Sequence, residues 1–109
     1  MTLGEARRTF TILLCRLVLW AEARGYGVAF AEGMDRVTVK DPTTDHMRYS
    51  LHESGLAQDL DLYKDGVYLT TTEDHRELGE HWEKMHPMCK WGGRFKNVDG
   101  NHYSFGSRR

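Results

Sequence analysis

Apolar residues recur at three- and four-residue steps from residue 3 to residue 24, and this period predicts one long amphipathic helix. Thr2 stands where an N-cap is expected, and Gly25 follows the last turn as an expected left-handed stop. Ile12 and Leu19 project from the opposite side, where we expect later loops to cover them, with a membrane or partner contact as the alternative. The predicted buried stripe comprises Leu3, Ala6, Phe10, Leu13, Leu14, Leu17, Val18 and Ala21.

Short segments with strand character follow this helix. Residues 26–30 and 37–39 are predicted strands separated by a turn at Gly33. Apolar and polar positions alternate in residues 56–63, which predicts a strand with one buried face and one face that borders a site. The expected buried set is Leu56, Leu60 and Leu62, and the expected site-facing set is Ala57, Asp59, Asp61 and Tyr63.

A second helix is predicted from about residue 73 to residue 85. Thr70 and Glu73 have the spacing of a capping box at its start, and Pro87 ends it. Gly79 lies inside this helix at a cost of ~1 kcal/mol relative to alanine, which indicates a tight packing contact. The predicted inward stripe is Leu78, Trp82 and Met85.

The remaining elements complete an α+β pattern. Asp65-Gly66 predicts a hairpin turn into a strand at residues 67–69, and residues 102–105 are a predicted last strand. The order of elements predicts a small antiparallel sheet with a long N-terminal helix and a second helix. We expect residues 1–109 to form a single domain, because this length leaves little room for a second one.

The composition argues against several classes of partner. The formal net charge is −1 over 109 residues, so we expect no nucleic-acid partner. The apolar run at residues 10–20 is about half the ~20 residues that a transmembrane helix needs, so neither a stable membrane anchor nor a signal peptide is expected. Cys15 and Cys89 lie far apart without Cys-x-x-Cys partners, which favours free thiols over a disulfide framework or a cysteine zinc site.

A metal-binding spacing lies between the predicted strands. His52 is followed seven residues later by Asp59, and the two can bind one metal ion if the chain turns between them. Gly55 permits that turn, and Ala57 keeps the strand face clear beside the ion. A neutral imidazole and a carboxylate suit zinc, whose catalytic sites have three protein ligands and an open fourth position.

The end of the chain supplies a third candidate ligand. Asp99 precedes His102 by three residues at the mouth of the last predicted strand. Zinc lowers the pKa of its bound water to ~7, but a nearby base is still needed to take the proton and pass it to the leaving amine. Asp99 is placed for that role if His102 is a ligand.

These segments resemble a known family. The pattern Ser-x-His-x-x-Gly-x-Ala-x-Asp is similar to that of the VanY/VanX family of zinc peptidases, which includes D-alanyl-D-alanine peptidases and the L-alanyl-D-glutamate peptidases used as phage endolysins. Trp91-Gly92-Gly93 and the later acid-x-x-His resemble the family in the same order, and the resemblance covers roughly residues 48 to 105. The first pattern is carried by Ser50, His52, Gly55, Ala57 and Asp59.

The resemblance implies a zinc site on the face of the sheet and roles for two further residues. Asp99 would be the catalytic base, and Arg48 would stabilise the oxyanion, with Arg36 as the alternative. The chain departs from the family after the last ligand, where many members read His-Phe-Glu and this one continues with Tyr103 and Ser104. Asn101 also replaces a frequent proline, and both changes bear on substrate preference. The implied zinc ligands are His52, Asp59 and His102.

The activity implied by the resemblance is hydrolysis of the L-alanyl–D-glutamyl bond in bacterial peptidoglycan stem peptides by a phage or prophage endolysin. Such an enzyme would be made in the host cytoplasm and would reach the cell wall through other lysis proteins. A D-alanyl-D-alanine carboxypeptidase is the alternative reaction, and a catalytically silent zinc-binding module or a phage structural protein is the non-enzymatic alternative. The expected cations for a D-glutamyl carboxylate are Arg48, Arg94 and Lys96.

The other polar and aromatic residues have simpler interpretations. His75 and His81 on the predicted second helix are expected to face solvent, whereas His46 and His86 are the alternatives for lining the cleft. Asp61 is either a group that orients a ligand histidine or a solvated acid. The aromatic residues expected to pack in the interior are Trp82, Trp91 and Tyr103.

Overall fold

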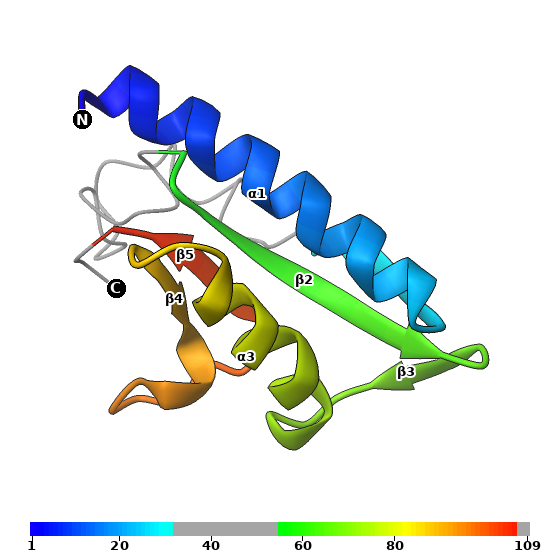
Figure 1. The fold of residues 1–109 in the computed structure, drawn as a ribbon. Helices are drawn as coiled ribbons and strands as arrows, with labels where there is room; N and C mark the ends of the chain where they lie inside the picture. The colour runs from blue at the N-terminus through cyan, green and yellow to red at the C-terminus, as the bar shows by residue number, and fades with distance from the viewer. Residues whose placement is uncertain (32–54, 107–109) are drawn as a thin grey trace, which may run out of the picture.

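A computed structural model describes residues 1–31 and 55–106 of the chain, and Figure 1 shows its course. The first element, α1 (Leu3–Ala23), has the predicted bounds to within one residue. Thr2 and Glu5 form a reciprocal capping box at its start, in which each side chain accepts the backbone N–H of the other. Gly25 follows with a φ of 93°, the left-handed conformation that the sequence predicts for the stop.

Three antiparallel strands come next: β1 (Tyr26–Phe30), β2 (Ala57–Lys64) and β3 (Val67–Leu69). Asp65 and Gly66 join β2 to β3 with φ values of 52° and 77°. A two-residue hairpin turn whose twist matches that of the strands requires positive φ at both central residues. The predicted hairpin is therefore confirmed. The predicted strand at residues 37–39 and the turn at Gly33 lie outside the described residues.

The second helical segment begins with a 3₁₀ turn, η1 (Glu73–His75), and continues as α3 (Arg76–Met85). The predicted capping pair was wrong by one position. Thr71 and Asp74 exchange the reciprocal bonds, at 3.1 Å from the Thr71 N–H and 3.0 Å from the Asp74 N–H. Because the segment starts as a 3₁₀ turn, the box forms around the turn that precedes the α-helix.

The chain ends with β4 (Cys89–Trp91), the 3₁₀ turn η2 (Gly92–Arg94) and β5 (His102–Phe105). The sequence pattern predicts β5 but not β4. The sheet order is β1-β2-β5-β4, and β3 pairs with β2. The predicted class, an antiparallel sheet with a long N-terminal helix and a second helix, is confirmed.

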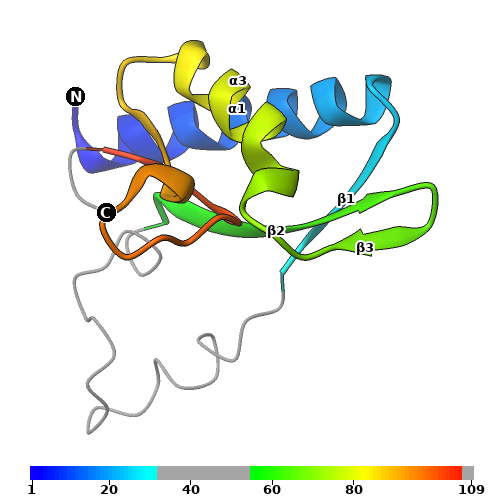
Figure 2. The same ribbon diagram turned by 90° about the horizontal axis from the view of Figure 1, so that it is seen from below.

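Both helices lie on one face of the sheet, as Figure 2 shows. Between helices and sheet is a core in which Leu60, Leu62, Leu78, Trp82 and Tyr103 are fully buried, whereas the predicted inward residues Leu56 and Met85 are only partly buried. Leu3, which was predicted to belong to the buried stripe of α1, is 54% exposed. Trp82 lies at the centre of the core and donates its indole N–H to the carbonyls of Lys90 and Ser104, each at 3.1 Å. The largest fully buried side chains are Trp82, Trp91, Tyr103, Phe105, Leu17, Leu60, Leu62 and Leu78.

The outer side of α1 remains exposed. Ile12 and Leu19 are 52% and 64% exposed, so the expectation that loops cover them is wrong. Cys15 is an exposed free thiol, and Cys89 is a buried one whose pKa is raised to about 12 by burial. Within the described part of the chain, no helix is long and apolar enough to cross a membrane.

Candidate metal site

Strand pairing brings two of the predicted metal ligands together. In the register of β2 against β5, Asp59 lies directly opposite His102. Directly opposed residues in an antiparallel pair have Cβ atoms about 4.5–5.5 Å apart, so their side chains can bind the same ion. Leu60 and Tyr103, the next residues along each strand, are buried in the core. Asp59 and His102 therefore project from the opposite face, away from the helices.

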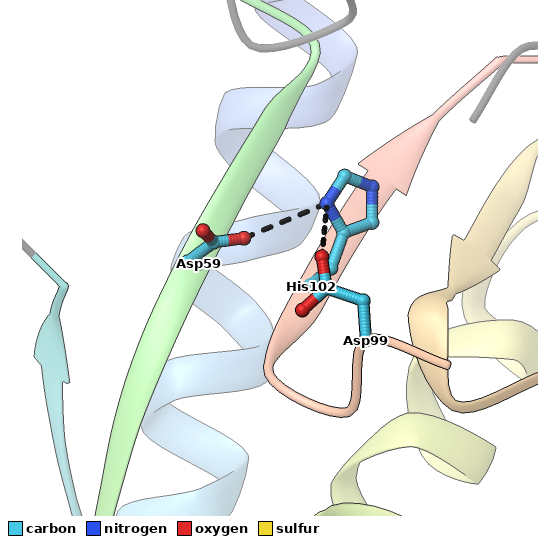
Figure 3. Close-up of side chains that lie close together, drawn as sticks. All are labelled: Asp59, Asp99 and His102. Atoms are coloured by element: carbon cyan, nitrogen blue, oxygen red, sulfur yellow. Dashed lines mark ion pairs between the residues drawn. The ribbon is translucent and has the colours of Figure 1, made fainter. Parts of the chain in front are cut away.

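A tight turn before β5 adds a second carboxylate. The N–H of His102 donates to the carbonyl of Asp99 at 3.1 Å, which folds the chain back so that Asp99 reaches the histidine ring. His102 Nδ1 lies 3.5 Å from Asp59 Oδ1 and 3.8 Å from Asp99 Oδ2. Figure 3 shows this one ring nitrogen facing both acids. The metal group, defined as Asp59, Asp99 and His102, offers three ligand atoms that all lie within 4.8 Å of one another.

The charge balance of this group suits a divalent cation. Two carboxylates face one imidazole, and such a set of oxygen and nitrogen donors can bind a divalent cation. A metal ion bound between them would neutralise the acids, with Nδ1 deprotonated and the ring proton on Nε2. The group could hold a metal ion, and its nitrogen and oxygen donors match those that zinc accepts.

The two acids of the metal group differ in exposure. The side chain of Asp59 is 23% exposed, whereas that of Asp99 is 49% exposed. A partly buried carboxylate that faces a ring nitrogen is suited to holding a cation. An exposed one can exchange protons with water, as a general base must after each turnover. Of the two acids, Asp59 is therefore the one more shielded from water.

Gly92 holds the turn that carries Asp99 and His102. Its carbonyl accepts the N–H of Asp99 at 2.9 Å and that of Phe95 at 3.1 Å. A Cβ on Gly92 would lie 2.1 Å from the Asp99 carbonyl oxygen and 2.8 Å from His102 Cβ. Only glycine lets the two backbone segments approach this closely, so Gly92 sets the position of both residues.

Trp91 holds the same turn from the core side. Its indole N–H donates to the carbonyl of Gly100 at 2.7 Å. Its ring occupies the space where Gly79 and Gly93 would otherwise carry a Cβ, at 2.1 Å and 2.3 Å from the nearest ring atoms. The tight contact predicted for Gly79 is therefore made with Trp91. Trp91 is 1% exposed and is a packing residue, as expected.

Small side chains flank the metal group on the same face of the sheet. Ala57 lies opposite Ser104 in the same strand pair, two residues from Asp59 and His102 respectively. Both are buried, and no described atom accepts or donates a hydrogen bond at the Ser104 hydroxyl. Gly55 has a φ of 76°, so it makes the turn into β2 that the motif predicts.

Several predicted site residues fall in the part of the chain that the structure leaves undescribed. His52 and Arg48 belong to it, together with Arg36 and His46. The roles predicted for His52 as a zinc ligand and for Arg48 as the oxyanion-stabilising arginine therefore stay predictions, as does the identity of the metal. Of the proposed cations for a substrate carboxylate, Arg94 is engaged with Glu83 at 2.9 Å and with Glu80 at 3.4 Å.

The structure gives contacts for Asp61 and His86, and it shows that His81, which was expected to face solvent, is partly buried. Asp61 accepts a hydrogen bond from the Tyr68 hydroxyl at 3.2 Å and is not part of the metal group. His86 accepts the N–H of Met88 at its Nδ1, 3.0 Å away, and its ring lies against Phe105. This histidine therefore shapes the end of α3. His81 stacks on Trp20 with ring centroids 3.8 Å apart and is partly buried.

His75 was wrongly expected to face solvent. It is 3% exposed, and its Nδ1 lies 2.7 Å from the hydroxyl of Tyr103. Burial lowers the pKa of His75, an effect partly opposed by Asp74 and Asp61. A signal for its burial was present in the sequence, because residues 75, 78 and 82 fall on one helical face.

Comparisons with known proteins add no assignment. No protein-family model matches the chain, and no curated protein matches it.

Proposed function

We propose that this protein is a zinc-dependent peptidase that hydrolyses the L-alanyl–D-glutamyl bond of bacterial peptidoglycan stem peptides. The observation that carries the proposal is the convergence of Asp59, Asp99 and His102 from two distant segments into one metal group. These are the residues to which the resemblance to VanY/VanX peptidases gives metal-binding and catalytic roles. The proposed setting is phage or prophage lysis, with synthesis in the host cytoplasm and access to the wall through other lysis proteins.

Each residue has a defined task in this proposal. Asp59 and His102 hold the zinc ion, with His52 as the predicted third ligand. Bound zinc would supply a polarised water molecule and Lewis acidity toward the scissile carbonyl. Asp99 would take a proton from the attacking water while the water oxygen bonds to the scissile carbonyl carbon, and would pass that proton to the leaving amine as the C–N bond breaks. Arg48 is proposed to hold the negative oxygen that forms on the carbonyl carbon.

Metal analysis of variants tests the binding half of the proposal. The wild-type protein should bind one zinc ion per chain after dialysis against zinc and removal of excess metal. Asp59→Ala and His102→Ala should each lose it, because a catalytic zinc site has only three protein ligands. Asp61→Ala is the matched control, since Asp61 lies on the same strand face but outside the metal group. Stoichiometric zinc in the His102→Ala protein would contradict the assignment.

Asp99→Asn tests the catalytic half. The amide keeps the shape of the carboxylate but cannot take a proton, so zinc should remain while turnover falls by about 10²–10⁴-fold. Loss of zinc in this variant would instead make Asp99 a ligand. Mass spectrometry of digested peptidoglycan identifies the bond: new amino-terminal D-glutamyl groups support the proposal. Free D-alanine with intact stem linkages would show a D-alanyl-D-alanine carboxypeptidase.

A further inference from the structure

The face of the sheet that carries the metal group continues along β2 toward the end of that strand. Leu60 and Leu62 are buried in the core, so the residues that alternate with them project from the opposite face. Asp59, Asp61 and Tyr63 therefore share that face, as the sequence pattern predicts. At about 3.3 Å per residue, Asp61 lies about 7 Å and Tyr63 about 13 Å along the strand from Asp59. The strand thus leads from the metal group to an exposed aromatic residue.

Two tyrosine rings lie at the far end of this face. The register of β2 against β3 places Tyr68 directly opposite Tyr63, so both side chains project to the same side. The ring centroids are 5.2 Å apart, the ring planes meet at 42°, and Tyr63 and Tyr68 are 37% and 51% exposed. The residue opposite Tyr63 in β1 is Gly27, which brings no side chain over the ring. The pair therefore presents a continuous aromatic surface to solvent.

Asp61 orients one of these rings and adds a polar group between the rings and the metal group. The Tyr68 hydroxyl donates to Asp61 Oδ1 at 3.2 Å, and this hydrogen bond raises the pKa of Tyr68. A carboxylate accepts several hydrogen bonds through its two oxygens, so Asp61 can also accept one from a ligand. Exposed aromatic faces beside an acceptor fit a ligand that has an apolar face and a polar edge. A pyranose sugar has this character, since C–H groups cover its ring face and hydroxyl or amide groups project from its edge.

The substrate of the proposed reaction carries such a sugar close to the scissile bond. In peptidoglycan, the L-alanyl residue is joined through a lactyl group to an N-acetylmuramyl ring of the glycan strand. The alanyl and lactyl units each span at most about 3.5 Å, so the ring begins about 7 Å from the scissile carbonyl. Asp61 lies at this separation from Asp59 along β2, and the tyrosine pair lies within about the next 7 Å. A stem peptide extended along β2, with its carbonyl at the metal group, therefore brings the sugar over the tyrosine rings.

We infer that Tyr63 and Tyr68 form a carbohydrate subsite, which holds the N-acetylmuramyl ring to which the stem peptide is attached. Asp61 accepts a hydrogen bond from a polar group at the edge of that ring. The inference rests on the proposed function, because it places the sugar by its chemical distance from the scissile bond. Such a subsite makes the protein selective for stem peptides that are still attached to the glycan strand.

Two peptides that differ only in the sugar test this subsite. They are N-acetylmuramyl-L-alanyl-γ-D-glutamyl-L-lysine, the muramyl peptide, and lactyl-L-alanyl-γ-D-glutamyl-L-lysine, the lactyl peptide. The zinc-loaded wild-type protein should cut the muramyl peptide with a kcat/KM at least about tenfold higher, because only this peptide gains the contact with the aromatic surface. Equal kcat/KM values would overturn the inference.

Removal of the rings tests the position of the subsite. Tyr63→Ala and Tyr68→Ala should each lower the ratio of the two kcat/KM values at least about threefold, and the double variant should bring the ratio close to one. This ratio does not depend on the folded or zinc-loaded fraction, because both peptides meet the same protein sample. Phe30→Ala is the matched control, since Phe30 is 53% exposed but lies opposite Leu60 and so belongs to the helix side of the sheet. Phe30→Ala should keep the wild-type ratio.

The outcomes separate failure of the subsite from failure of the proposed function. If both peptides are cut between alanine and the glutamyl residue with equal kcat/KM, the peptidase activity stands and the subsite inference fails. If the tyrosine variants lose kcat/KM equally for both peptides, the rings hold the peptide portion and the assignment of the sugar is overturned. A wild-type ratio in the tyrosine variants, or an equal loss in Phe30→Ala, overturns it as well. If neither peptide is cut, the proposed function fails, and the inference that rests on it fails too.

Discussion

Replacing Gly92 by alanine should lower the metal affinity more than the same replacement at any other described glycine near the metal group. The new Cβ would lie 2.1 Å from the Asp99 carbonyl oxygen and 2.8 Å from His102 Cβ. Non-bonded heavy atoms settle near 3.5–4.0 Å, so the turn must move by roughly 1 Å or more to relieve the overlap. Both contacts are made to atoms that cannot rotate away.

The expected magnitudes follow from that displacement. Overpacking of a well-packed region costs about 1–3 kcal/mol, and we expect the free energy of unfolding to fall within that range. Ligand distances in a metal site are held to about 0.2 Å, so a shift of roughly 1 Å removes Asp99 and His102 from productive geometry. Zinc affinity should drop by at least about tenfold, the lower bound for losing a group that orients a ligand.

The assay combines zinc titration against a chromophoric chelator with urea unfolding of the metal-free protein. Gly27→Ala is the matched control, because its Cβ would meet Tyr63 Cβ at an ordinary 3.5 Å and Gly27 lies on β1, outside the metal group. The control should keep zinc affinity and lie within about 0.5 kcal/mol of the wild type in stability. Wild-type zinc affinity in Gly92→Ala would refute the view that this backbone contact positions the site.

Two further predictions concern stability. Because burial lowers the pKa of His75, the folded state binds the proton less readily than the unfolded chain, whose histidines titrate near 6.5. The contribution of His75 to stability is therefore present above about pH 6.5 and is lost as the pH falls through its lowered pKa. Between pH 8 and pH 5, the urea midpoint of the wild type should fall more steeply than that of His75→Gln. Equal pH dependence of the two midpoints would contradict this prediction. Thr71→Ala should lower the free energy of unfolding in urea by about 1 kcal/mol, because it removes the reciprocal cap with Asp74. Thr70→Ala should leave the free energy of unfolding nearly unchanged. A larger loss in Thr70→Ala than in Thr71→Ala would instead support the Thr70–Glu73 capping box predicted from the sequence.

The sequence alone determined the elements whose signals are local. The period of α1, the Thr2 cap and the Gly25 stop act within one helix, because helix formation depends on neighbours three and four residues away. The hairpin at Asp65 and Gly66 is equally local, since the allowed φ values at these two positions decide the turn. The motif around Asp59 and the later Asp99 and His102 could likewise be recognised as candidate metal ligands by residue type and spacing.

Tertiary structure decided everything that depends on which distant segments meet. The register that places Asp59 opposite His102 joins residues 43 positions apart, and no local pattern specifies it. His75, which was expected to face solvent, is buried because Tyr103 and the core close over the helical face that it shares with Leu78 and Trp82. The closeness of Gly92 to Asp99 arises only when η2 packs against the turn before β5, because contact between such segments is set by packing rather than by conformational preference.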